Sequence, residues 1–157
     1  MKIKLIIVGK TTDASLIQLE EIYKNRLKYY VSFEVLVVPE LKNTKSLSIG
    51  EQKEKEADLL LKILDANDDI ILLDEKGQQF TSVEFSTFLS KKQQTSYKSV
   101  TFVIGGAYGF SDRIYSRASS LVSLSKMTFS HQMVRVFFLE QLYRAMTIQK
   151  GEPYHHE

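Results

Sequence analysis

Residues 102–110 read FVIGGAYGF, an apolar run that passes directly into two adjacent glycines and reaches a third glycine three residues later. The whole chain has seven glycines, so this short stretch holds three of them. Glycine lets main-chain N–H and C=O groups approach a ligand without an intervening Cβ, and it also accepts positive φ in tight turns. The stretch therefore predicts a buried strand at residues 99–104 whose carboxyl end either faces a ligand or turns sharply.

The familiar phosphate-binding motifs fit this stretch poorly. A dinucleotide site has the spacing G-x-G-x-x-G after the first strand of its unit, whereas here the spacing is G-G-x-x-G after the fourth expected strand. A P-loop continues from its glycines into Lys and Ser or Thr, whereas Phe110 follows Gly109 here. Nothing nearby offers a cluster of cations for a triphosphate. A flat ligand lying against bare main chain fits these residues better.

Apolar, β-branched runs alternate with amphipathic segments along the rest of the chain. Strands are expected at residues 3–8, 33–38, 69–73, 99–104 and 121–124, and helices at 13–29, 51–64, 82–92, from 111 onward, and at 130–149. This alternation predicts an α/β fold with a mostly parallel sheet. A turn is expected at residues 74–77, and the polar residues 41–50 are expected to form a mobile loop that faces the substrate.

Length and composition indicate a single globular domain spanning residues 1–157. The absence of cysteine excludes disulfides, thiolate catalysis and zinc–thiolate sites. No apolar run approaches the ~20 residues of a membrane span, so we expect a soluble, cytoplasmic protein with no membrane partner. A net charge of +2 is compatible with a nucleic-acid partner but does not by itself indicate one.

A second loop, residues 123–135, reads SLSKMTFSHQMVR and follows the strand after the glycine stretch. The carboxyl ends of neighbouring parallel strands lie at one edge of a sheet, so the two loops are expected to form a crevice there. The turn after Leu73 is expected to add a third wall. Glycine main chain combined with Leu, Met and Phe suits an adenine ring and an apolar tail.

The last expected helix carries apolar side chains around nearly its whole circumference, including Phe137 and Phe138. A surface helix shows one apolar stripe, so this helix must be covered on more than one side. Either a second copy of the chain covers it, which would make a homodimer, or it lies centrally within one domain.

Five motifs, in order along the chain, carry a family resemblance: VGK at 8–10, IGGAYG at 104–109, SLSKMTFSHQMVR at 123–135, EQLYRA at 140–145 and GEPYH at 151–155. Together they resemble the RlmH family of the SPOUT superfamily, over the full length of the chain. The resemblance implies a SPOUT-type α/β fold with a C-terminal trefoil knot. It also implies a homodimer that uses S-adenosyl-L-methionine to methylate N3 of a pseudouridine in 23S ribosomal RNA, in the helix 69 stem-loop of the assembled ribosome. The cofactor contacts that it implies are Leu73, Gly105, Leu124, Ser125, Lys126, Met127, Thr128 and Phe129.

Candidate catalytic groups lie towards the C-terminus. Because N3 of the target is an imide that carries a proton, a base or a solvent path must remove that proton. His131 is a candidate base, Arg144 a candidate ligand for an imide oxygen or a phosphate, and Tyr154 a candidate for stacking on the base or hydrogen bonding to it. Each has a structural alternative: a helix-start role for His131, an i,i+4 ion pair with Glu140 for Arg144, and tail packing for Tyr154.

Contacts to RNA would have to come from scattered cations, most of which are expected to be ordinary solvated side chains: Lys10, Lys24, Arg26, Lys28, Lys42, Lys45, Lys91, Lys92, Arg113 and Arg117. No metal site is expected, because three histidines without organised carboxylates are a weak ligand set. Two other functions are compatible with the residues. One is a non-catalytic dimeric module that binds an adenosyl ligand or rRNA, and the other is a nucleotide-binding domain of flavodoxin type.

Overall fold

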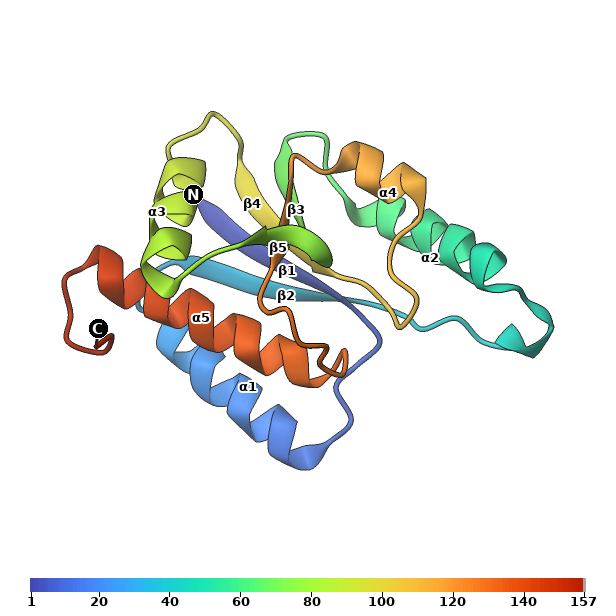
Figure 1. Cartoon of the computed structure of the whole chain (residues 1–157), viewed down its shortest axis with the longest axis horizontal. Coiled ribbons are helices and arrows are strands. Elements are labelled where there is room, and N and C mark those ends of the chain that lie inside the picture. Colours follow the sequence, from blue (N-terminus) through green and yellow to red (C-terminus); the bar gives the residue numbers. More distant parts are fainter. Residues whose placement is uncertain (157) are drawn as a thin grey trace.

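A computed structural model of the protein describes residues 1–156. Five strands form one sheet in the order β2-β1-β4-β3-β5, and every neighbouring pair is parallel (Figure 1). The strands are β1 (Lys2–Val8), β2 (Ser32–Val38), β3 (Asp68–Gln79), β4 (Ser99–Ile104) and β5 (Ser120–Ser123). The α/β class and the parallel sheet expected from the sequence are confirmed.

Helices cover both faces of this sheet. They are α1 (Ala14–Leu27), α2 (Ile49–Ile63), α3 (Ser82–Gln93), α4 (Asp112–Arg117) and α5 (Met133–Gln149). Alternate side chains of β1 point into two separate apolar cores. Those of Ile3, Leu5 and Ile7 pack with α1, α3 and α5, and those of Ile6 and Val8 pack with α2 and α4. Parallel strands that are apolar on both faces require such cover, which is why the strand sequences show no polar alternation.

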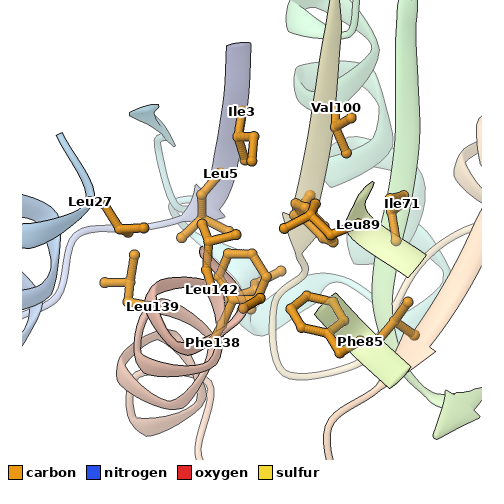
Figure 2. Packing of buried hydrophobic residues seen from close by; sticks show 14 of the residues in the cluster. Ile3, Leu5, Leu27, Ile71, Phe85, Leu89, Val100, Phe138, Leu139 and Leu142 are labelled. Atoms are coloured by element: carbon orange, nitrogen blue, oxygen red, sulfur yellow. The ribbon is translucent and has the colours of Figure 1, made fainter. Parts of the chain in front are cut away.

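The last helix, α5, packs against α1, α3 and the middle of the sheet (Figures 1 and 2). The ring centroids of Phe138 and Phe102 of β4 lie 4.8 Å apart, and Phe138 is fully buried. The central position within one chain therefore accounts for much of the apolar circumference of α5. It does not account for Met133 and Phe137, which remain 38% and 41% exposed.

Side-chain caps begin the helices close to the expected positions. The Asp13 carboxylate accepts hydrogen bonds from the N–H groups of Ser15 and Leu16. Thr81 and Glu84 form a reciprocal capping box at the start of α3. The expected start of the last helix at residue 130 is three residues early, although the Ser130 hydroxyl accepts from Met133 N at 3.1 Å in the manner of a cap.

The turn expected at residues 74–77 is wrong, because β3 continues to Gln79. Val122 of β5 pairs with Leu73 and again with Gln78, so the residues between these two bulge outward around β5. A Cβ on Gly77 would lie 2.5 Å from backbone atoms of Val122. The glycine is therefore needed for a close crossing of two chain segments. The trefoil knot stays a prediction.

The polar segment at residues 41–50 is partly regular. It contains a 3-10 turn at Thr44–Ser46, and α2 begins within it, at Ile49. Asn43 precedes the turn in the left-handed conformation, which asparagine tolerates better than most residues.

Candidate functional site

A cleft of about 460 Å³ opens at the carboxyl ends of β4 and β5 and beside the middle of β3. Every residue expected from the sequence to contact a cofactor lines it: Leu73, Gly105, Leu124, Ser125, Lys126, Met127, Thr128 and Phe129. His131 lines the same cleft. The two loops singled out in the sequence therefore face each other across one space, with residues 74–76 as the expected third wall.

Glycine is favoured for a different structural reason at each of the three glycine positions in the glycine loop, residues 105–109. A Cβ on Gly105 would lie 2.9 Å from the Phe110 ring, and a Cβ on Gly106 would lie 2.6 Å from a carboxylate oxygen of Glu56. Gly109 has a φ of +81° and open space around it, so its conformation alone requires glycine. Close packing behind Gly105 and Gly106 and the left-handed turn at Gly109 thus place the main chain of the loop at the cleft wall.

The wall beyond Leu73 is held by a hydrogen bond between the middle of β3 and α4. The Tyr115 hydroxyl donates to the Asp74 carboxylate, which also accepts from Lys76 N at 2.8 Å. Burial raises the pKa of Tyr115, and the hydrogen bond to Asp74 raises it further. Tyr115 therefore remains a neutral donor that fixes this wall.

The opposite wall, residues 124–129, is shaped by its own hydroxyl groups. The Ser123 hydroxyl donates to the Ser125 carbonyl, and the Ser125 hydroxyl accepts from Met127 N, both at 2.9 Å. Met127 is 75% exposed, and the Phe129 ring lies 4.7 Å from that of Phe137. An ordered turn that holds a large apolar side chain in solvent is suited to closing over a ligand.

A buried arginine that was not singled out from the sequence anchors this wall to the N-terminal half of the chain. Arg135 is 1% exposed and donates to the carbonyl of Val8 at 2.7 Å and to the hydroxyl of Thr11 at 2.9 Å. Burial lowers the pKa of Arg135, and the charges of Glu20 and Glu40 oppose that shift. In the sequence Arg135 is the last residue of the motif at 123–135 and a cation at the start of an apolar helix, and neither feature predicts its partners.

The candidates Arg144 and Tyr154 lie together in a second cluster around Glu140. Arg144 Nε donates to Glu140 Oε1 at 3.1 Å, and the Tyr154 hydroxyl donates to the same oxygen at 3.1 Å. The guanidinium lies 4.7 Å from the centre of the Tyr154 ring, and His155 Nδ1 lies 3.3 Å from Arg144 Nη1. Both structural alternatives, the i,i+4 ion pair and the packed tail, are thus present.

Burial and the contacts to Glu140 keep Arg144 and Tyr154 protonated. The hydrogen bond to Glu140 raises the pKa of Arg144, so the guanidinium keeps its charge. Burial, followed by the charge of Glu140, raises the pKa of Tyr154 to about 12. Tyr154 is therefore a hydrogen-bond donor near neutral pH and not a base.

Arg144 and Tyr154 do not line the cleft of their own chain. At 1.5 Å per residue, Arg144 lies roughly 16 Å further along α5 than Met133. Of the three catalytic candidates, the structure places only His131 beside the cofactor loops.

Several of the scattered cations have partners within the chain. Lys92 Nζ lies 3.1 Å from the Asp69 carboxylate, and Arg113 Nε lies 2.7 Å from that of Glu54. Within residues 1–156, no group of His, Asp and Glu side chains is arranged to hold a metal ion, and no helix is long and apolar enough to cross a membrane.

Among solved structures, the fold is similar to the crystal structure of a probable methyltransferase from Bordetella pertussis Tohama I. The TM-score is 0.54 at 11% identity, with 92% of this chain and 93% of that chain covered. The family model described as "Predicted SPOUT methyltransferase" matches residues 1–155. The chain belongs to the SPOUT methyltransferase family. The RlmH resemblance is confirmed by curated relatives of the same length.

These relatives carry the name "Ribosomal RNA large subunit methyltransferase H". The one from Parabacteroides distasonis is 56% identical over 157 residues and covers 100% of both chains. The one from Flavobacterium johnsoniae is 55% identical over 157 residues, again with 100% of both chains covered.

Proposed function

We propose that this SPOUT protein is a cytoplasmic enzyme that transfers a methyl group from S-adenosyl-L-methionine to N3 of a pseudouridine in 23S rRNA, in helix 69 of the assembled ribosome. The observation that carries the proposal is that all eight residues of the implied cofactor set line one cleft. Full-length identity of 55–56% to relatives named as large-subunit rRNA methyltransferases supports the substrate class.

The residues of the cleft suit an adenosyl compound. Its volume of about 460 Å³ lies within the range of small-molecule sites. Main chain at Gly105 offers N–H and C=O groups to an adenine edge, and Leu124, Met127 and Phe129 offer apolar surface. When bound there, S-adenosylmethionine would supply a methyl group already activated on a sulfonium. The protein would mainly align this donor with the attacking nitrogen.

The remaining tasks are to bind the target base and remove its N3 proton. His131 lines the cleft, so it can accept that proton directly or through water. The permanently charged Arg144 can stabilise the deprotonated imide through its oxygen, and Tyr154 can donate a hydrogen bond to it. Because these two side chains lie outside the cleft of their own chain, we propose that they act in the cleft of a second protomer.

Exposed apolar side chains support a binding surface for a second protomer. Ile17, Leu19 and Ile22 of α1 are 40%, 40% and 44% exposed, and Met133 and Phe137 of α5 add to them. A cavity of about 400 Å³ adjoins the cleft, shares residues 122–125 and Phe129 with it, and reaches Phe137. We propose a homodimer through α1 and α5 in which the partner's tail approaches the cleft from this side.

Labelled methyl transfer tests the function. Ribosomes from a strain that lacks the gene should accept a methyl group from S-adenosylmethionine when the protein is added, and mass spectrometry should locate it on a pseudouridine of helix 69. Deproteinised 23S rRNA should be a poor acceptor, because a net charge of +2 provides little general affinity for RNA. Intact acceptor ribosomes that gain no label, together with tight cofactor binding, would instead indicate the non-catalytic module.

A further inference from the structure

Three carboxylates of α2 reach the segment that contains the glycine loop. Glu56 Oε1 accepts a hydrogen bond from Gly106 N at 3.1 Å. Glu54 and Asp58 accept from Arg113, at 2.7 and 2.9 Å, just beyond the other end of the loop. One helix therefore holds the loop at Gly106 and the chain shortly after the loop, at Arg113.

The Glu56 contact is closely fitted. Its Oε2 lies 2.6 Å from the position that a Cβ on residue 106 would occupy, so a larger residue there would push the carboxylate away from its present position. Burial raises the pKa of Glu56, and the hydrogen bond from Gly106 opposes that shift. A partly desolvated carboxylate is costly, and this hydrogen bond is the compensation that the structure gives it.

Glu56 does not itself line the cleft, whereas Gly105, Gly106 and Lys53 do. Its hydrogen bond to Gly106 N links it directly to the cleft-lining main chain of the glycine loop. Its carboxylate also occupies the Gly106 N–H, which in a phosphate-binding loop would face the anion. The arrangement leaves the loop shaped for contact with a flat ring and unsuited to a phosphate.

We propose that Glu56 is a positioning residue that sets the main chain of the glycine loop for the adenosyl cofactor and closes the loop to phosphate. This inference rests on the proposed function. The acceptor oxygen matters more than the charge, so glutamine, which keeps an acceptor oxygen at the same reach, should replace glutamate in this role.

The test compares Glu56→Ala, Glu56→Gln and, as a matched control, Glu51→Ala, which removes an exposed acid from the same helix. Calorimetry with S-adenosylhomocysteine should show Glu56→Ala binding about tenfold more weakly, since the hydrogen bond that holds the loop main chain is lost. Glu56→Gln and Glu51→Ala should stay within about threefold of wild type. In methylation assays, KM for S-adenosylmethionine should rise in Glu56→Ala while kcat changes little.

A second readout does not require a working methyltransferase. Exchange of the Gly106 amide hydrogen, followed by NMR, should be slow in wild type and Glu56→Gln and fast in Glu56→Ala. If wild type binds no adenosyl compound, the proposed function fails, but amide exchange at Gly106 still tests whether Glu56 holds the glycine loop. Equal affinity and equal exchange in Glu56→Ala would overturn the inference, as would Glu56→Gln behaving like Glu56→Ala.

Discussion

Replacing Gly77 with alanine tests the crossing of β3 and β5 on which the cleft depends. The new Cβ would lie 2.5 Å from the N and C atoms of Val122 and 2.6 Å from the Leu121 carbonyl carbon. These are backbone atoms of a paired strand, so no side-chain rotation relieves the contact. β5 must then move away from β3 or lose its pairing, and residues 123–125 of the cleft wall move with it.

The expected cost lies at the upper end of the range for overpacking, about 3 kcal/mol. For a domain of this size, each kcal/mol lowers the melting temperature by roughly 2–4 °C, so Gly77→Ala should melt about 6–12 °C below wild type. Affinity for S-adenosylhomocysteine should fall as well, because the displaced strand leads directly into the Leu124–Phe129 wall.

Two glycines supply matched controls for the thermal melts. Gly50 lies near the start of α2 with its nearest neighbouring atom at 3.9 Å, so Gly50→Ala should be neutral or stabilising by up to about 1 kcal/mol. Gly109 has open space but a φ of +81°, so Gly109→Ala should cost about 1–2 kcal/mol through backbone strain alone. If Gly77→Ala melted at the same temperature as Gly50→Ala and its affinity for S-adenosylhomocysteine were unchanged, the close crossing of β3 and β5 would be refuted.

Three further outcomes are expected. Arg144→Ala should lower methyl transfer at least ~100-fold and leave calorimetric affinity for the cofactor unchanged, because its proposed role is to stabilise the deprotonated target base and not to contact the cofactor; weakened cofactor binding with unchanged methyl transfer would contradict this role. Phe137→Asp should give a folded monomer in sedimentation, whereas Phe138→Asp, in the core, should fail to fold; a Phe137→Asp dimer would refute the proposed interface. The pKa of Tyr154 is about 12 in the folded chain and about 10 in the unfolded chain, so protonated Tyr154 contributes to the free energy of unfolding below pH 10, and this contribution is lost as the pH rises towards 12. In denaturant titrations, the free energy of unfolding should therefore fall less for Tyr154→Phe than for wild type over this pH interval. An equal fall would show that Tyr154 is not the source of the pH dependence.

The fold was predictable because its determinants are local. β1 and β4 are apolar on both faces, and Asp13 and Ser111 mark helix starts with their own side chains. The end of β3 was not predictable, because residues 74–79 are polar and become a strand only by pairing with β5, distant in sequence. The single-domain organisation of residues 1–157 and the knot remain predictions.

The cofactor loops were predictable because they follow strand ends and carry recognisable motifs. The contacts behind them were not, since Glu56 and Arg135 read as an ordinary helix acid and an ordinary helix cation. The separation of Arg144 from the cleft follows from the length of α5 and its packing direction. The spacing of residues in the sequence does not predict in which protomer's cleft a side chain would act.

A crystal structure of the protein with S-adenosylhomocysteine tests the central claim most directly. The account predicts electron density for the adenosyl group between main chain at Gly105 and the Leu124–Phe129 wall, with Glu56 still bonded to Gly106 N. Density elsewhere, or a cleft that stays without ligand at saturating concentration, would contradict it.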